Sequence, residues 1–381
     1  MKAILEKIDG YRENMLSFLE KLVNIDSSID NPEGIKQVAE IVGGKLTEIG
    51  FDVKYLNYPG YTTHVLARKS GKSDKNLMII GHIDTVFSKG TAAKRPFTIR
   101  DEKAYGPGVL DMKGGITIAL FSLQALAQQG WDKSNITVLF CGDEETGHPH
   151  SDAKDIFTKE AKGKDAVFNM ETGAESGTVV VGRKGVIFPV INVEGKSAHA
   201  GKDPEKGASA ILELAHKIIE LYKINNKETG ISFNPGIISG GTAPNAIAGE
   251  AQVKCDMRFM KLDQHEQILK DLKRIVNTTF VPGTKTTIID EKRIRFMPME
   301  MTKVNLDLYE IVRKQGLKIG IEVGKISVGG GSDSCWTTIV GAPTVCAMGA
   351  RGELNHSERE YIIVDSLVER AKLLALSIQA V

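Results

Sequence analysis

The 381-residue sequence is poor in cysteine and has almost no excess of either charge. Only four cysteines occur and none forms a Cys-x-x-Cys pair, so neither a disulfide framework nor a thiolate zinc site is indicated. Lys and Arg number 49 against 48 Asp and Glu, which leaves a formal net charge of +1. This balance gives no support for nucleic acid or an anionic membrane as a partner, since either usually requires a basic excess.

Long apolar runs are also missing. No run of about 18 apolar residues occurs, so no transmembrane helix is expected. Acidic Glu6 and Asp9 interrupt the N-terminal segment, so a secretory signal is not indicated. The remaining composition, 41% hydrophobic and 25% charged, is that of an ordinary globular chain with enough material for a large core. The default expectation is a cytoplasmic enzyme or binding protein.

The first half of the chain has the rhythm of an α/β domain. Apolar residues recur at helical spacing through residues 1–50. Short apolar runs at 51–56, 77–80 and 137–141 then predict strands, and the Ala- and Leu-rich segment 115–130 predicts a helix. Alternating strands and helices favour a sheet covered by helices.

Residues 185–297 follow a different pattern. Strand-like runs at 186–193, 231–238, 251–257 and 285–296 combine with two amphipathic helices in the order β-α-β-β-α-β, which is ferredoxin-like. The α/β rhythm returns after about residue 305. The sequence therefore predicts a discontinuous α/β domain, residues 1–184 and 298–381, interrupted by an inserted α+β domain over 185–297.

Acidic and histidine residues recur beside glycines at the ends of the predicted strands. Such ends meet at one edge of an open α/β sheet, where ligands bind. The residues are His82, Asp84, Asp111, Glu144, Glu145, Glu171 and, late in the chain, His356.

Imidazole and carboxylate together suit Zn²⁺ and its first-row neighbours. Two histidines with three or more carboxylates exceed what one zinc takes, but two metals about 3.5–4 Å apart can share such a set through one carboxylate. Adjacent Glu144 and Glu145 would repel each other unless a cation neutralises one, which leaves the other free as a general base. The short spacing of His82 and Asp84 lets the carboxylate orient the imidazole.

Three segments carry a family resemblance: His82-Ile83-Asp84-Thr85-Val86, Asp111-Met112-Lys113-Gly114-Gly115 and Asp143-Glu144-Glu145-Thr146-Gly147. Together they resemble the motifs of a co-catalytic zinc metallopeptidase family of bacterial glutamate carboxypeptidases, aminoacylases, dipeptidases, tripeptidases and succinyl-diaminopimelate desuccinylases. The resemblance extends over nearly the whole chain. It implies a mixed-sheet zinc-exopeptidase catalytic domain with an inserted ferredoxin-like lid and dimerisation domain.

The resemblance also implies individual roles. Asp111 would bridge two Zn²⁺ ions per subunit, with Co²⁺ or Mn²⁺ as substitutes, and the peptide bond after it would be cis. His82 and Glu171 would complete one site, and Glu145 and His356 the other. Glu144 would be the general base, and Asp84 would orient His82. Glu171, where many members have Asp, resembles the glutamate carboxypeptidase and desuccinylase branches.

Further motifs resemble those that contact substrate in the family. His199, in Gly195-Lys196-Ser197-Ala198-His199-Ala200-Gly201, would stabilise the oxyanion from its own subunit or from the neighbour in a homodimer formed through the inserted domain. Asn245 and Arg258 would hold the substrate's carboxylate, although a structural salt bridge is the alternative for Arg258. Backbone N–H groups around Gly330, Gly331 and Ser332 would assist.

Three other residues are not assigned to the chemistry. His148 and His150 follow the Glu144-Glu145 motif and are interpreted as loop residues. Cys141 lies in a predicted buried strand and is interpreted as a small core residue. One departure from the family concerns Glu353 and Leu354, which stand near His356 where many members have glycines.

The resulting hypothesis is a zinc-dependent exo-hydrolase that cleaves an amide bond next to a free carboxylate. The substrate would be a small peptide or N-acyl amino acid, with C-terminal glutamate as the residue released. A dipeptidase or tripeptidase, an aminoacylase and a desuccinylase are alternatives within the family. A non-catalytic metal-dependent binding protein is a more remote alternative, against which Glu144 argues because a binder needs no general base.

Overall fold

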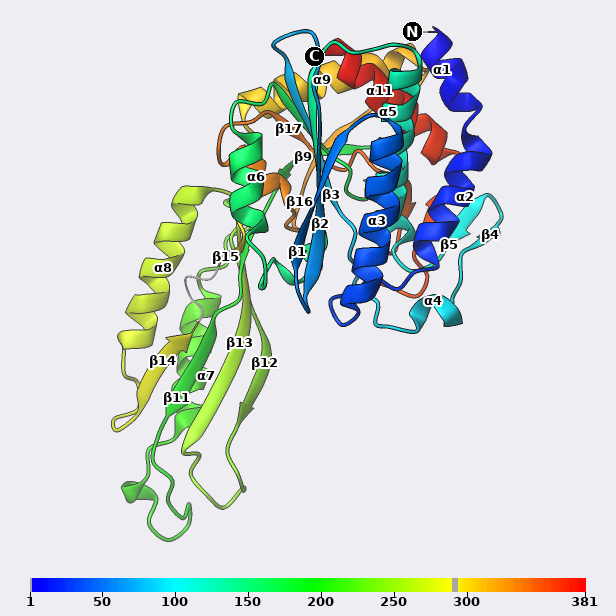
Figure 1. Cartoon of the computed structure of the whole chain (residues 1–381). Helices are drawn as coiled ribbons and strands as arrows, with labels where there is room; N and C mark the ends of the chain where they lie inside the picture. Colours follow the sequence, from blue (N-terminus) through cyan, green and yellow to red (C-terminus); the bar gives the residue numbers. More distant parts are fainter. Residues whose placement is uncertain (1, 290–293) are drawn as a thin grey trace. The chain divides into compact units, whose positions relative to one another are not determined.

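The computed structural model describes residues 2–289 and 294–381, and it divides into two compact units (Figure 1). The large unit comprises residues 1–181, 301–327 and 332–381, and the small unit comprises residues 182–300 and 328–331. Each unit has its own hydrophobic core.

The large unit is built on a mixed six-stranded sheet. Its middle strands run parallel and its first two pair antiparallel, so the carboxyl ends of the parallel strands meet at one edge. The strands in spatial order are β1 (Asp52–Tyr58), β2 (Thr62–Lys69), β6 (Asn135–Cys141), β3 (Asn76–His82), β7 (Ala166–Asn169) and β17 (Thr344–Val345).

Helices cover both faces of this sheet (Figure 1). On one face, α3 (Pro32–Glu48) packs on β1 and β2, while α5 (Gly114–Gln128) packs on β3 and on α11 (Ser366–Ala380). Helices α6 (Ala153–Ala161) and α10 (Ser334–Thr338) lie on the other. The remaining helices are α1 (Lys2–Asp9), α2 (Arg12–Val23), α4 (Thr91–Lys94) and α9 (Lys303–Lys318).

Residues 109–128 form the one helical stretch, among the described residues, that is long and apolar enough to cross a membrane. Its apolar window is 94% buried inside the protein. A helix that is apolar all round is expected at the centre of a large core, and α5 holds that place between the sheet and α11.

A second, five-stranded sheet lies beside the first in the large unit. Strand β18 pairs with β8 in parallel and with β19 antiparallel. Its spatial order is β4 (Thr98–Arg100), β5 (Lys103–Tyr105), β19 (Tyr361–Ile363), β18 (Arg351–Glu353) and β8 (Gly173–Ala174). Strands β9 (Val179–Arg183) and β16 (Lys325–Val328) form a separate pair, along which the chain passes between the units.

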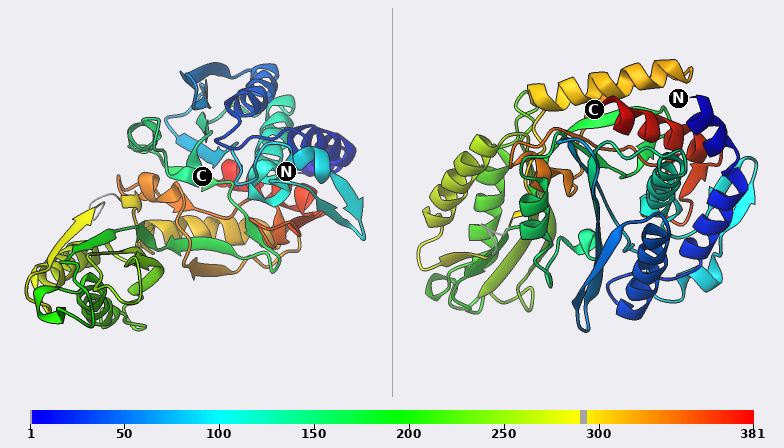
Figure 2. Two further views of the ribbon diagram at one scale, coloured as in Figure 1. Left: turned by 90° about the horizontal axis from the view of Figure 1, so that it is seen from below. Right: turned by 45° about the horizontal axis from the view of Figure 1, so that its top comes forward.

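The small unit has the ferredoxin-like arrangement. Four strands of its six-stranded sheet lie in the order β14-β11-β13-β12, and helices α7 and α8 pack on the sheet (Figure 2). A Ser209 side chain caps α7 by accepting from the Leu212 N–H at 3.2 Å. The elements in chain order are β11 (Val190–Glu194), α7 (Ala210–Tyr222), β12 (Ser232–Gly240), β13 (Glu250–Phe259), α8 (Leu262–Asn277) and β14 (Lys285–Ile289).

These observations confirm the predicted fold class and add detail to it. The single run expected over 186–193 is divided into β10 (Gly185–Ile187) and β11 by Phe188 and Pro189. The run over 285–296 contains β14 and β15 (Ile294–Phe296), and its residues 290–293 lie outside the described residues. Strand β2 has no counterpart in the prediction: its first six residues are buried, yet it begins Thr62-Thr63-His64 and so shows no apolar run.

Candidate metal centre

The loops that follow β3, β6 and β7 bring the acidic and histidine residues of the sequence motifs together. His82 ends β3, Glu144 and Glu145 follow β6, and Glu171 follows β7. Asp111 lies in a short irregular helix, Val109–Lys113, and the Asp111–Met112 peptide bond is cis, as the resemblance implied. All these residues belong to the large unit.

His82, Asp111 and Glu171 form the first cluster, and all three are buried. The Nε2 atom of His82 lies 3.0 Å from Oδ1 of Asp111 and 3.7 Å from Oε1 of Glu171. One donor atom from each residue lies within 4.8 Å of the others. The geometry therefore places one imidazole nitrogen and two carboxylates around a common point.

Asp111, Glu145 and His356 form the second cluster. The Nε2 atom of His356 lies 3.0 Å from Oδ2 of Asp111 and 3.3 Å from Oε2 of Glu145. The two carboxylate oxygens of Asp111 thus face different clusters. Asn355, which precedes His356, donates its Nδ2 to the same Oδ2 at 3.1 Å.

The Asp84 carboxylate connects the two clusters. Its Oδ1 lies 3.4 Å from Nδ1 of His82, whose Nδ1 also lies 3.1 Å from the Asp84 backbone oxygen. The backbone N–H groups of Glu144 and Glu145 donate to Oδ1 and Oδ2 of Asp84 at 3.2 and 3.0 Å. One buried carboxylate therefore holds an imidazole and the turn that carries both glutamates.

Two glycines let other segments approach Glu171 closely. A Cβ atom on Gly115, at the start of α5, would lie 1.9 Å from the Met170 backbone oxygen. A Cβ atom on Gly349 would lie 2.6 Å from the Glu171 backbone oxygen. Neither position has room for a side chain, which accounts for glycine in both loops.

The electrostatics of the centre are those of carboxylates crowded in a buried place. Burial raises the pKa of Glu144 well above its ordinary value, and neighbouring Glu171 and Asp333 add to the effect. Burial likewise raises the pKa of Glu145 to about 7, although His356 opposes it. Hydrogen bonds to Asp111 and Glu145 raise the pKa of His356 to about 11.

This set of donors fits divalent cations. Imidazole nitrogen with carboxylate oxygen is the ligand chemistry of zinc and its first-row neighbours, and one carboxylate, Asp111, faces both clusters. Positive charge placed there would relieve the repulsion among Glu144, Glu145 and Glu171.

Glu360 is a residue of this region that the sequence patterns do not reveal. Its carboxylate accepts from three backbone N–H groups at and around Asp111: those of Leu110 at 2.8 Å, Asp111 at 2.9 Å and Gly108 at 3.1 Å. Glu360 is only 1% exposed. It lies 249 residues from Asp111 in the sequence, and no local motif marks such a partner.

The remaining predicted site residues divide between the two units. In the small unit, His199 and Asn245 are exposed and lie on adjacent segments, because Ala200 N–H donates to the Asn245 backbone oxygen at 2.9 Å. The Arg258 guanidinium contacts Asp256 at 2.8 Å and donates to the Gly329 backbone oxygen at 2.6 Å.

The glycine-rich segment 329–331 also makes hydrogen bonds within the small unit. The backbone oxygens of Gly330 and Gly331 accept from Nη1 of Arg183 at 3.4 and 3.1 Å in the small unit. Ser332 begins the following segment of the large unit and is buried there.

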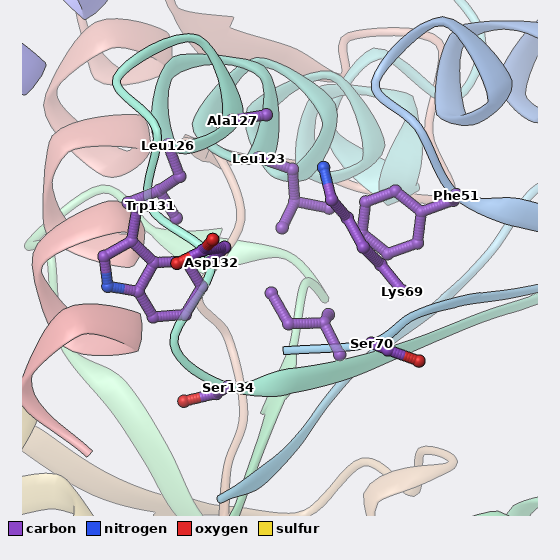
Figure 3. Close-up of a pocket in the computed structure, with 10 residues that line it drawn as sticks. Phe51, Lys69, Ser70, Leu123, Leu126, Ala127, Trp131, Asp132 and Ser134 are labelled. Atoms are coloured by element: carbon purple, nitrogen blue, oxygen red, sulfur yellow. The ribbon is translucent and has the colours of Figure 1, made fainter. Parts of the chain in front are cut away.

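A separate pocket of the large unit lies at the end of α5 (Figure 3). Phe51, Leu123 and Trp131 give it an apolar lining, and the Lys69 ammonium at its edge donates to the Ile49 backbone oxygen at 2.8 Å. None of its lining residues belongs to either cluster.

Comparison with known proteins places this chain in a family. The model of Peptidase family M20/M25/M40 matches residues 78–380. This chain is a member of that family. Carboxypeptidase G2 of Pseudomonas sp. (strain RS-16) is 31% identical over 368 residues, which cover 95% of this chain and 88% of the relative. Acetylornithine deacetylase of Erwinia tasmaniensis is 29% identical over 273 residues, or 68% of each chain.

Solved structures show the same fold. Aminopeptidase PepT of Bacillus cereus superposes with a TM-score of 0.82 at 21% identity, covering 97% of this chain and 98% of that one. A tripeptidase of Staphylococcus aureus gives a TM-score of 0.81 at 22% identity with the same coverage. The family is metal-dependent, and the chain is therefore a metallo-exopeptidase or amidohydrolase of the M20 family.

Proposed function

We propose that this protein is a two-zinc exo-hydrolase that cleaves an amide bond next to a free carboxylate and releases C-terminal glutamate from peptides or N-acyl amino acids. The observation that carries the proposal is the pair of donor clusters sharing Asp111, with buried Glu144 beside them. The similarity to carboxypeptidase G2 over 95% of the chain supports a carboxypeptidase. Glu171 in place of Asp agrees with the glutamate carboxypeptidase branch and equally with the desuccinylase branch.

The residues would act as follows. His82 and Glu171 would hold one zinc, Glu145 and His356 the other, and Asp111 both. Zinc bound there lowers the pKa of water and polarises a carbonyl group. Glu144 takes the proton from the attacking water at its carboxylate and delivers it to the leaving nitrogen.

Asp84 supports this step by positioning. It keeps His82 in one orientation and fixes the backbone of Glu144 and Glu145 through two hydrogen bonds. A general base needs its carboxylate within hydrogen-bond reach of the proton that it removes, and a fixed turn provides that reach.

The inserted segment, residues 185–297, is proposed to serve as lid and dimerisation domain. His199 would stabilise the developing oxyanion, and Asn245, Arg258 and the backbone near Gly330, Gly331 and Ser332 would hold the carboxylate of the substrate. In the structure Asp256 occupies the guanidinium of Arg258, so a substrate carboxylate would compete with it.

The exposed surface of the small unit supports the dimer. Strand β12 is an edge strand that pairs only with β13 among the described residues, and Ile237 and Ile238 on it are both 62% exposed. Helix α7 exposes Leu212 and Ile219 as well. Apolar side chains exposed on an edge strand and a helix are typical of a subunit interface.

The location of the protein in the cytoplasm stays a prediction.

An acylase or deacetylase is the second candidate, because acetylornithine deacetylases match 68% of the chain at 29% identity. The two candidates differ in the product amine. Zinc-loaded protein is therefore assayed with N-acyl amino acids that differ only in that residue: glutamate, aspartate, alanine and ornithine. Preference for glutamate supports the proposal, and preference for ornithine supports the deacetylase.

The mechanism is tested with Glu144→Gln, and Glu358→Gln, an exposed change in the same unit, is the control. We expect Glu144→Gln to lower kcat by at least about 10²-fold, the usual contribution of a general base, while two zinc ions per subunit remain bound. A Glu144→Gln enzyme with nearly full kcat would overturn the mechanism. A wild-type protein that binds two metals and hydrolyses no amide would favour the binding protein instead.

A further inference from the structure

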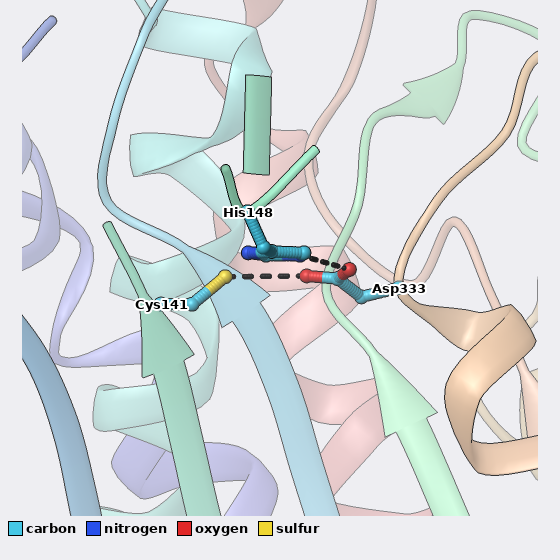
Figure 4. Close-up of side chains that lie close together, drawn as sticks. All are labelled: Cys141, His148 and Asp333. Carbon is cyan, nitrogen blue, oxygen red and sulfur yellow. Dashed lines mark hydrogen bonds and ion pairs between the residues drawn. The ribbon is translucent and has the colours of Figure 1, made fainter. Parts of the chain in front are cut away.

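A second group of buried polar side chains lies in the large unit and includes Cys141, His148 and Asp333 (Figure 4). His148 is at its centre and has both ring nitrogens on carboxylates. Its Nδ1 lies 2.7 Å from Oδ1 of Asp143, and its Nε2 lies 2.7 Å from Oδ1 of Asp333. The Cys141 thiol donates to Oδ2 of Asp333 at 3.2 Å.

This arrangement explains how two carboxylates are buried together. Asp143 is 0% exposed and Asp333 is 2% exposed, and a buried carboxylate without a cationic partner is strongly unfavourable. Burial alone would lower the pKa of His148, but Asp333 and Asp143 outweigh it and raise the pKa to about 10. His148 is therefore an imidazolium that donates one hydrogen bond to each carboxylate.

The two carboxylates belong to segments with different tasks. Asp143 directly precedes Glu144 and Glu145, and its backbone oxygen also accepts from the His148 N–H at 3.0 Å. Asp333 directly precedes α10 and is 185 residues away from His148 in the sequence. His148 therefore joins the turn that carries the two glutamates to the start of α10.

We propose that His148 is a positioning residue for the hydrolytic reaction, which holds the Glu144-Glu145 turn in place by bridging Asp143 and Asp333. The inference rests on the proposed function, because it assumes that Glu144 is the base and Glu145 a metal ligand. The ring of His148 contacts Asp143 and Asp333, so it would act on the turn through Asp143.

The same side chains are also close enough to bind a metal ion, because donor atoms of Cys141, His148 and Asp333 lie within 4.8 Å of one another. Two observations indicate that hydrogen bonds, and not a metal ion, link these side chains. Both nitrogens of His148 lie at hydrogen-bond distance from carboxylates. The Cys141 thiol likewise lies at hydrogen-bond distance from a carboxylate, 3.2 Å from Oδ2 of Asp333.

The test compares His148→Gln with His150→Gln in the zinc-loaded enzyme. His150 lies in the same loop but is exposed and stacks on Tyr61, so its replacement is a matched control. We expect His148→Gln to lower kcat by about tenfold or more and to weaken metal retention against a chelator by about tenfold, with little change in KM. The absorption spectrum of the cobalt-loaded enzyme reports the coordination change directly.

Because His148→Gln leaves two buried carboxylates, it can fail to fold, and Asp333→Asn provides a second route. Added to His148→Gln, Asp333→Asn removes one uncompensated charge and should restore part of the lost metal retention. Alone, it keeps a hydrogen-bond acceptor for His148 and should change kcat less than His148→Gln does.

The outcomes separate the two proposals. If the wild-type enzyme is active and both histidine variants match it in kcat, metal retention and cobalt spectrum, the role of His148 is refuted while the proposed function stands. If the wild type binds no metal or hydrolyses no substrate, the proposed function itself fails. A third zinc per subunit that is lost in Cys141→Ser would show that a metal, not a proton, bridges the group, and would overturn the inference.

Discussion

Replacing Glu360 by Gln tests how the backbone around Asp111 is held. The wild-type carboxylate accepts the N–H groups of Leu110, Asp111 and Gly108. The Gln amide has one acceptor oxygen, and its NH₂ group cannot accept. If the oxygen stays on Leu110 and Asp111, the NH₂ group faces the Gly108 N–H, which loses its partner in a buried place.

The structure gives the size of the effect. An unsatisfied buried donor lowers the free energy of unfolding by about 1–3 kcal/mol. The two bonds that remain also change from charged to neutral, which weakens each roughly twofold. We therefore expect a total loss of about 3 kcal/mol. Burial raises the pKa of Glu360 to about 7, so the comparison is made at about pH 8.5, where the wild-type group is ionised.

The weakened hydrogen bond to the Asp111 backbone should also change the position of the Asp111 carboxylate in the candidate metal centre. A partner that orients a metal ligand typically contributes 10–100-fold to metal affinity or activity, and we expect about tenfold or more in both for Glu360→Gln. Zinc affinity is measured by competition with a chelator, kcat with the best amide substrate, and stability by urea unfolding. Glu358→Gln, two residues away and exposed, should match wild type in all three. Wild-type zinc affinity and stability in Glu360→Gln would refute this account of the loop.

Three further predictions concern other parts of the chain. The Cβ of Gly115→Ala would lie 1.9 Å from the Met170 backbone oxygen, so this variant should lower the free energy of unfolding by about 3 kcal/mol. Gly44 is exposed in α3 with open space around it, and Gly44→Ala should raise the free energy of unfolding by about 0.5–1 kcal/mol. Equal effects of the two variants in thermal unfolding would contradict the packing argument. Lys217 is fully buried, pairs with Glu213 at 2.9 Å and donates to three backbone oxygens near the end of α8. Lys217→Met should therefore destabilise the small unit by about 3–5 kcal/mol, and an unchanged urea unfolding curve would contradict this. Burial opposes ionisation of Glu213, but Lys217 and two backbone N–H groups outweigh burial and lower the pKa of Glu213. The difference in free energy of unfolding between wild type and Glu213→Gln should therefore be constant above about pH 5 and shrink as the pH falls. A difference that grows in acid would contradict this argument.

The fold class could be predicted from the sequence because its main signals are local. The β-α-β-β-α-β order of the small unit and the apolar strands β3, β6 and β7 are each visible within a few tens of residues. Strand β2 could not be predicted from local pattern, because its first three residues are polar although the strand is buried within the sheet between β1 and β6. Tertiary contact, not local pattern, makes that segment a strand.

The candidate site divides in the same way. His82, Asp111, Glu145 and Glu171 stand beside glycines at strand or helix ends, so their convergence could be expected, and the structure brings their donor atoms together. Their roles as ligands stay predictions. The partners of Glu360 and His148 are a different case, because they are separated by 249 and 185 residues and show no spacing to recognise.

The carboxylate of Asp84 places a limit on how the centre can be redesigned. Its Oδ1 lies beside His82, which belongs to one cluster. Its two oxygens also accept from the turn that bears Glu144 and Glu145, and Glu145 belongs to the other cluster. A substitution of Asp84 cannot change the surroundings of His82 without also affecting the turn that bears Glu144 and Glu145. His82 and Glu145 each belong to one cluster, but Asp84 holds both of them. Glu171 and His356 are therefore the positions at which the preference of one cluster for an ion would be altered by itself.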